Sequence, residues 1–267
     1  METLVDLTRP LVVLDKDTFP AVLMPLFRII APEVEFVDHK AGARIMSQIF
    51  GCSEADLPSG EGWAEENISL SSHLGTHVDA PWHYGSTCAG ARARTVDQIP
   101  LNELYADAVV LDLTHKRGTG QAITVEDLEK ALSRTGYRIK PGDAVLIRTD
   151  HDKFDLRDPL RYNYPGLVRE SSLWLADVGA KIGGTDALGW DRPFPVMVAD
   201  WQRTRDKRYI WDAHYALREV EFYVVQQLAN LDKLPASGFR VGFFPLPLVG
   251  ASAAPARAVA FLPGAST

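Results

Sequence analysis

Residues 71–85 read Ser-Ser-His-Leu-Gly-Thr-His-Val-Asp-Ala-Pro-Trp-His-Tyr-Gly, and the interpretation of the whole chain starts from this stretch. Within eleven residues it holds His73, His77, Asp79 and His83, so three of the seven histidines share a short segment with a carboxylate. Neutral imidazole and carboxylate are ligands that suit zinc or manganese. The composition of the segment therefore predicts a metal site.

The spacing of the segment indicates extended chain and turns. Gly75 and Pro81 both disfavour one continuous helix, whereas turns can fold several ligands back onto one ion. His77 and Asp79 are two residues apart, so they would share one face of an extended strand. A single histidine is more often a packed core or surface residue than a ligand, but packing alone does not explain this cluster.

The motif is long enough to suggest a family. The pattern His73-x-Gly75-Thr76-His77-x-Asp79-Ala80-Pro81-x-His83 resembles the signature of the cyclase-like metal-dependent hydrolases, which include bacterial kynurenine formamidase, isatin hydrolase and trans-dienelactone hydrolase. Weaker agreement over residues 4–8, 142–149 and 228–235 extends the resemblance over nearly the whole chain, with residues 15–65 the least similar part.

The resemblance implies an α/β fold for residues 1–267: a single compact domain with a mixed β core of the swivelling β/β/α type and flanking helices. It also implies a homo-oligomer, either a dimer or a tetramer. Residues 15–65 are interrupted by Pro20, Pro25, Pro32 and Pro58, and we expect loops and short elements there that form part of a substrate cap.

Roles for individual residues follow from the same resemblance. His73, His77 and Asp79 match the positions that hold one divalent ion, manganese or zinc. His83 matches the acid/base histidine, which would carry a proton from water to the leaving nitrogen or oxygen.

Relatives place a ligand to a second metal at the position of His214, and a glutamate that touches the metals twelve residues later. This chain has Gln226 there, a departure that weakens a second site. A neutral amide offers one carbonyl oxygen and no charge, whereas a carboxylate can bridge two cations. We therefore expect one divalent ion, as in isatin hydrolase. Glu221 is a weaker candidate ligand, because two turns of helix from His214 correspond to about 10 Å.

The composition excludes several function classes. A net charge of −7 and a pI near 5.5 argue against a nucleic-acid or anionic-membrane surface. There is no apolar run long enough to span a membrane. Two cysteines, Cys52 and Cys88, and an N-terminal sequence without a basic or apolar leader predict a reducing cytoplasm.

Hydrophobic patterning predicts the main elements. We expect strands within residues 3–14 and at 106–113, 144–149, 182–186, 240–244 and 256–262. We expect a helix over 124–134 with Thr124 as N-cap and Asp127 at the capping-box position, a second helix from Ser171 or Ser172 to Val178, and a largely helical segment over 211–228. Residues 150–153 and 190–195 read as loops, and the small-residue loop 249–255 is expected near the site.

The sequence thus predicts a metal-dependent hydrolase that cleaves an amide or lactone bond of a small, aromatic or cyclic substrate. Trp63 and Trp82 are candidate substrate-binding residues, although packing against the core is the favoured interpretation of Trp63. Two alternatives remain open at this point. One is a lyase or cyclisation catalyst that uses the ion as a Lewis acid, and the other is a small-molecule-binding protein without turnover.

Overall fold

The computed structural model describes residues 2–264. Tertiary contacts divide the chain into two compact units. The larger contains Met1–Pro10 and Ser72–Thr267, and the smaller contains Leu11–Ser71. The motif of residues 71–85 lies almost entirely in the larger unit.

The larger unit is built on one mixed sheet with strand order β1-β14-β13-β7-β9-β11-β12-β4. β14 also pairs with β4, which closes the strands from β14 to β4 into a barrel. The strands are β1 (Thr3–Asp6), β4 (His77–Asp79), β7 (Tyr105–Asp112), β9 (Ala144–Arg148), β11 (Ile182–Thr185), β12 (Tyr223–Gln226), β13 (Ser237–Pro245) and β14 (Ala253–Leu262).

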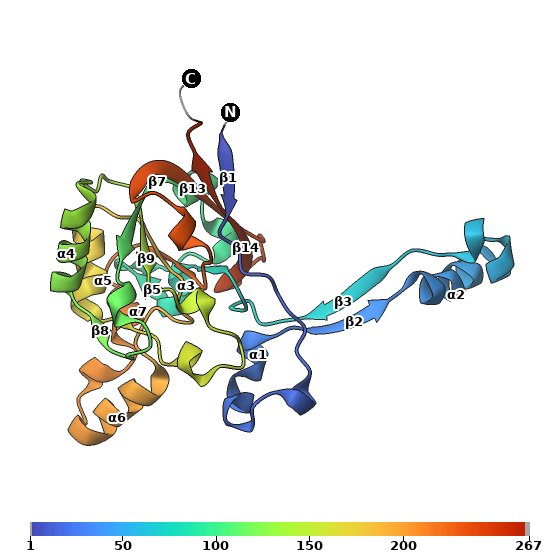
Figure 1. The fold of residues 1–267 in the computed structure, drawn as a ribbon, viewed down its shortest axis with the longest axis horizontal. Coiled ribbons are helices and arrows are strands. Elements are labelled where there is room, and N and C mark those ends of the chain that lie inside the picture. Colours follow the sequence, from blue (N-terminus) through green and yellow to red (C-terminus); the bar gives the residue numbers. More distant parts are fainter. Residues whose placement is uncertain (1, 265–267) are drawn as a thin grey trace. The chain divides into compact units, whose positions relative to one another are not determined.

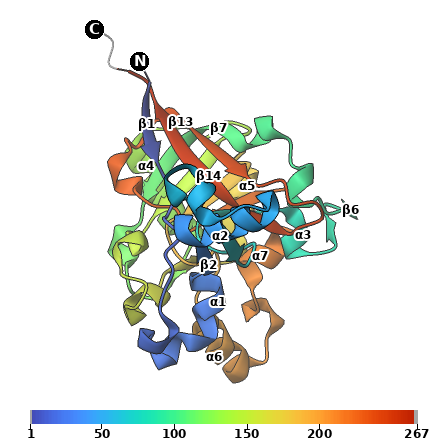
Figure 2. The same ribbon diagram turned by 90° about the vertical axis from the view of Figure 1, so that its right-hand side faces the viewer.

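Strand direction changes around this barrel. β7, β9, β11 and β12 are parallel to their neighbours in that series, whereas β1, β4, β13 and β14 pair in antiparallel fashion. Figures 1 and 2 show β1, β13 and β14 running side by side. Short two-stranded sheets join β5 (Thr87–Cys88) to β6 (Ala91–Arg92) and β8 (Ala122–Ile123) to β10 (Gly166–Leu167).

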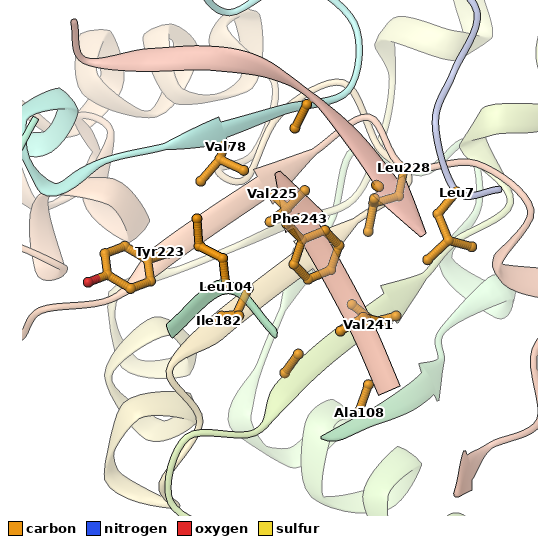
Figure 3. Close-up of a cluster of buried hydrophobic side chains, with 14 of the residues drawn as sticks. Leu7, Val78, Leu104, Ala108, Ile182, Tyr223, Val225, Leu228, Val241 and Phe243 are labelled. Carbon is orange, nitrogen blue, oxygen red and sulfur yellow. The ribbon is translucent and has the colours of Figure 1, made fainter. Parts of the chain in front are cut away.

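Both faces of the sheet are buried. Val78, Ile182, Val225 and Val241, on four different strands, meet in one apolar cluster that fills the inside of the barrel (Figure 3). Residues of β7, β9 and β12, among them Val109, Val145 and Val224, face outward into a second cluster that includes side chains of α4 and α5. Near-continuous apolar strands such as Ala144–Arg148 are the expected pattern for a sheet covered on both faces.

Helices cover the outer face of the barrel, and α4 and α5 lie against it in Figure 1. Thr124 and Asp127 form the predicted capping box of α4. The helices of this unit are α3 (Pro81–Tyr84), α4 (Val125–Thr135), α5 (Arg169–Asp177), α6 (Phe194–Thr204) and α7 (Asp212–Ala216). Among residues 2–264, no helix combines the length and apolar character needed to span a membrane.

The smaller unit is more regular than its prolines predicted. It contains α1 (Phe27–Ile30), the hairpin of β2 (Glu33–Val37) and β3 (Glu65–Ser69), and the 12-residue helix α2 (His39–Phe50). The expectation of only loops and short elements was wrong here, because Pro32 and Pro58 flank α2 and none lies inside it. Asp38 caps its first turn and Gly51 ends it in the left-handed region.

Three further element predictions need correction. Residues 211–228 are not largely helical: α7 ends at Ala216 and Tyr223–Gln226 is a strand. No strand forms at residues 11–14, and β1 ends where Asp6 accepts a hydrogen bond from the Thr8 amide. Residues 190–195 run into α6, because Pro195 is tolerated in the first turn of a helix.

The start of α5 also differs from the prediction. The helix begins at Arg169, and Ser171 accepts a hydrogen bond from the Val168 amide instead of acting as the N-cap. The mixed β core with flanking helices, by contrast, is confirmed.

Candidate metal centre

The centre is organised by β4, which lies between β12 and β14. In the antiparallel pairing of β4 with β12, His77 lies opposite Gln226 and Asp79 lies opposite Val224. Residues directly opposite one another in an antiparallel pair point to the same face. Val78 and Val225 fill the barrel, so His77, Asp79 and Gln226 project from its outer face.

The carboxylate of Asp79 is the meeting point of the motif. Its Oδ1 lies 2.8 Å from His73 Nδ1 and 3.3 Å from His77 Nε2. Asp79 is completely buried. Burial alone would raise its pKa, but interactions with the surrounding histidines hold the pKa well below its usual range. The group is therefore an ionised carboxylate surrounded by imidazole nitrogens.

Two buried atoms of this cluster face each other without a hydrogen bond. Neither His77 Nε2 nor Asp79 Oδ1 has a hydrogen-bond partner of acceptable geometry among residues 2–264. An unsatisfied buried polar atom is costly unless something else binds it. His77 Nδ1 lies 2.7 Å from the Gly75 carbonyl oxygen, which directs Nε2 toward Asp79. His77 Nε2 and Asp79 Oδ1 could therefore bind one divalent cation, and nitrogen and carboxylate oxygen are suitable ligands for manganese or zinc.

His83 is carried by the short helix α3, which starts at Pro81. Its ring lies 4.1 Å from the ring of His73, centroid to centroid. Ligand atoms of His73, Asp79 and His83 all lie within 4.8 Å of one another. Burial lowers the pKa of His83 to about 3. The structure thus brings a neutral imidazole to the edge of the cluster.

His214 reaches the same carboxylate from α7, with Nε2 3.7 Å from Asp79 Oδ2. Its other nitrogen, Nδ1, makes a short contact with Asp191 Oδ2. Burial alone would lower the pKa of His214, but the Asp191 carboxylate raises it to about 9. Asp191 also accepts hydrogen bonds from the backbone amides of Ala213 and His214. It thereby fixes both the start of α7 and the ring of His214.

Gln226 lies directly against the motif. Its side-chain amide donates a hydrogen bond to Asp79 Oδ2 at 2.5 Å and lies 3.4 Å from His214 Nε2. The second oxygen of Asp79 is therefore engaged by a neutral group of the chain. This contact places the residue that departs from the family pattern inside the cluster.

Several residues of the centre were not found from the sequence. The sequence predicts a loop at Asp191. The only feature of the sequence that could have indicated a role is that this carboxylate lies between Trp190 and Arg192. Trp211 stacks on His214, with ring centroids 4.5 Å apart and planes 20° apart. Ser252 Oγ lies 3.0 Å from His73 Nε2, so the predicted loop does contact the motif, although residues 253–255 belong to β14.

Gly166 in β10 makes room for the Asp191 backbone. A Cβ atom at that position would lie 2.1 Å from the Asp191 carbonyl carbon. A larger residue would therefore move Asp191, and with it the group that orients His214.

Other predicted residues have different outcomes. Trp82 precedes His83 on α3 and its ring faces the Arg92 guanidinium, and Trp63 belongs to the smaller unit; their roles in substrate binding stay predictions. Trp190 is fully buried in the core. Glu221, the weaker candidate ligand, pairs instead with Lys181 and Arg94.

Residues 150–153 are not simply a solvated loop. His151 is completely buried, with Nδ1 3.0 Å from Thr149 Oγ1 and Nε2 accepting a hydrogen bond from the Gly118 amide. Burial lowers its pKa to about 4. Asp150 and Asp152 lie close to the buried carboxyl of Asp186.

Comparison with known proteins adds a family to this geometry. The family model described as "Putative cyclase" matches residues 5–192. Isatin hydrolase of Roseibium aggregatum is 29% identical over 214 residues, which cover 73% of this chain and 74% of that protein. Kynurenine formamidase of Paracidovorax citrulli is 28% identical over 194 residues, covering 72% and 77%.

Solved structures agree along nearly the full length. Isatin hydrolase A from Labrenzia aggregata, bound to benzyl benzoate, superposes with a TM-score of 0.70 at 26% identity, over 98% of this chain and 94% of that one. A structure described as a potential metal-dependent hydrolase with cyclase activity gives a TM-score of 0.62 at 23% identity, over 99% and 100%. The second likeness concerns the fold alone.

Proposed function

The chain belongs to the putative cyclase family and is a metal-dependent hydrolase, and on that premise we propose that it cleaves the C–N bond of a small aryl amide. The substrate class is an aryl formamide or a cyclic aryl amide, as the names of the relatives suggest, and a lactone is the alternative within the same chemistry. The relatives carry hydrolase and formamidase names, which do not favour the lyase, cyclase or binding-protein alternatives.

We propose that His73, His77 and Asp79 hold one divalent ion, manganese or zinc. The observation that carries this assignment is the pair of buried atoms, His77 Nε2 and Asp79 Oδ1, that face each other without hydrogen bonds. When bound, such an ion would lower the pKa of a water molecule and polarise the substrate carbonyl.

His83 is proposed as the acid/base residue. Because burial keeps its imidazole neutral near pH 7, it can accept a proton from the attacking water and return it to the leaving nitrogen. Its ring lies 4.1 Å from that of His73, so the proton would be moved at the edge of the metal centre.

A single ion is supported by Gln226. The amide occupies Asp79 Oδ2, the oxygen that could otherwise bridge to a second cation, and it contributes no charge to offset one. His214, held by Asp191, would then orient Asp79 and the substrate instead of binding a second ion.

We also propose a homo-oligomer, a dimer or tetramer, in the cytoplasm. Support comes from the smaller unit, where Phe36, Ile49, Phe50 and Ile68 are each 58–68% exposed. Apolar surface of this kind is typical of interaction sites. The two free cysteines fit a reducing compartment. The role of residues 15–65 as a substrate cap stays a prediction.

The function is tested by metal analysis and turnover together. Protein purified without added metal or chelator should contain about one equivalent of manganese or zinc per chain. It should hydrolyse formanilide or isatin, and removal of the metal with a chelator should stop turnover. Absence of bound metal after reconstitution, or turnover that survives the chelator, would refute the proposal.

A His83→Ala variant separates proton transfer from metal binding. We expect it to keep its metal and to lose about 10²–10⁴-fold in kcat, the usual contribution of general acid–base catalysis. A loss of metal would instead identify His83 as a ligand, which its position within 4.8 Å of His73 and Asp79 would permit.

A further inference from the structure

We propose that Trp211 is the platform on which the aromatic ring of the substrate stacks, so that the enzyme selects aryl over saturated cyclic amides of equal size. The inference rests on the proposed amide hydrolysis and names the residue and the ring chemistry that give it specificity. Trp211 was not recognised as a site residue from the sequence.

The first observation is the backbone of Trp211. The residue sits immediately before α7 with φ 49° and ψ 42°, in the left-handed region. This conformation is unfavourable for a bulky side chain and suits Gly, Asn or Asp. Such positions persist where surrounding contacts hold them, and they gather at ligand-binding sites. The strained backbone places the indole against the metal centre.

The second observation is the set of rings around the indole. One face stacks on His214, with centroids 4.5 Å apart and planes 20° apart. The ring of His83 meets Trp211 edge-on, with centroids 5.0 Å apart and planes 89° apart. The indole therefore touches both the proposed acid/base residue and the imidazole that faces Asp79.

The third observation is access from solvent. Trp211 is only partly buried, and Tyr215, whose ring meets the indole edge-on at 5.1 Å, is 43% exposed. Among the ring contacts of residues 2–264, Trp211 is the one tryptophan that touches imidazoles of the centre. Trp190 is enclosed in the core, and Trp82 contacts Arg92.

Together these contacts form an aromatic corner beside His83, with the indole of Trp211 only partly buried. A flat ring gains stacked or edge-on contacts there that a saturated ring of the same size does not make. An aryl amide whose ring lies on Trp211 would have its C–N bond beside His83, because the two side chains are in contact. The geometry thus couples ring recognition to proton transfer.

The test uses formanilide and N-cyclohexylformamide, which carry a six-carbon aromatic or saturated ring; because aniline is also the better leaving group, the readout is the change in preference between wild-type and variant protein. Wild-type protein should prefer formanilide in kcat/KM. Trp211→Leu should reduce that preference about tenfold, and Trp211→Phe should retain most of it. Trp211→Asn suits the left-handed backbone and is the second variant if the leucine variant does not fold.

Trp201→Leu is the matched control, since Trp201 is a partly exposed tryptophan on α6 whose ring faces Arg205. It should leave the preference unchanged. A purely structural role of Trp211 would lower turnover of both formamides equally. An unchanged preference in folded Trp211→Leu or Trp211→Asn would therefore overturn the proposal.

A binding measurement tests the role of Trp211 independently of turnover. Phenylglyoxylate should bind the wild-type protein more tightly than cyclohexylglyoxylate by calorimetry, and Trp211→Leu should remove most of the difference. If neither formamide nor isatin is hydrolysed, the proposed function fails, and the binding pair still decides the role of Trp211. Equal affinity of wild-type protein for the two acids would refute the platform.

Discussion

Two clusters of histidine and aspartate lie near strand ends in this protein, and they differ in what their buried atoms contact. The first is the motif cluster around Asp79. The second consists of Asp150, His151, Asp152 and Asp186. The motif cluster has three histidines and one aspartate and the second has one histidine and three aspartates, and each contains one completely buried carboxyl group.

In the second cluster, the chain itself satisfies the acids. Asp186 accepts hydrogen bonds from the Thr149 and Asp150 amides and from the Thr149 hydroxyl. Arg148 binds Asp150 through two nitrogens, and Asp152 accepts from the Asn230 amide. In the motif cluster, His77 Nε2 and Asp79 Oδ1 lack such partners among the described residues. The unsatisfied buried atoms, together with the three histidines, therefore distinguish the candidate metal centre.

The two buried carboxyl groups also differ in ionisation. Neighbouring imidazoles hold the pKa of Asp79 well below its usual range. Burial raises the pKa of Asp186 to about 7, and the nearby charge of Asp152 contributes to the same direction. An ionised carboxylate can bind a cation, whereas a protonated one can donate a hydrogen bond.

The largest effect is expected from a substitution in the motif cluster. Asp79→Asn should remove bound metal and lower turnover at least about a thousandfold, because the ion's stabilisation of the transition state is lost. Asp152→Asn is the matched control and should keep both metal and turnover. Metal analysis measures bound metal, and formanilide hydrolysis measures turnover. Equal metal loss in both variants would contradict the assignment of the metal centre to the motif cluster.

The raised pKa of Asp186 in the second cluster should make the free energy of unfolding depend on pH. Because the folded-state pKa of Asp186 lies above its unfolded value, the folded protein holds this proton between about pH 4 and pH 7. As pH rises across that window, the contribution of Asp186 to the free energy of unfolding should fall by about 1.4 kcal/mol per pH unit.

Urea unfolding of wild-type protein and Asp186→Asn at several pH values measures this contribution. The asparagine variant should lack the decline that Asp186 adds, while its metal content stays the same. Parallel pH profiles for the two proteins would show that Asp186 is already ionised in the folded state.

A smaller effect should follow from loosening the link between the motif and His214. Asp191→Asn should lower metal affinity or turnover by about 10–100-fold, as is typical when a carboxylate that orients a metal-site histidine is lost. Asp212→Asn is the matched control, since Asp212 bonds the Arg169 amide and not His214. Competition titrations with a chromophoric chelator measure affinity; identical results for the two variants would remove the role of Asp191.

The smallest effect concerns the number of ions. Gln226→Glu should raise bound metal above one equivalent per chain, because a second carboxylate beside Asp79 can offset the charge of another cation. Gln226→Leu, which removes the hydrogen bond without adding charge, should not. Unchanged metal content in the glutamate variant would show that the amide does not limit a second site.

Local patterns predicted a large part of the fold. The strand at 144–149 follows from a run of apolar and β-branched residues, and α4 follows from the capping pair Thr124 and Asp127. Residues 211–228 were harder, because their composition suits a helix while Tyr223–Gln226 pairs with two strands that are distant in sequence. Strand pairing there overrides local propensity.

The sequence by itself determined the motif, the family it resembles and the types of donor atom, because these depend on residue identity and short spacing. Tertiary structure alone decided that Asp191 orients His214, that Gln226 contacts Asp79 and that Trp211 joins the two histidines. Apart from the Trp211–His214 stack, which is local to the start of α7, these contacts join segments brought together by sheet closure or loop packing. Local sequence carries no direct signal of such contacts, since the partners are set by the strand order of the barrel.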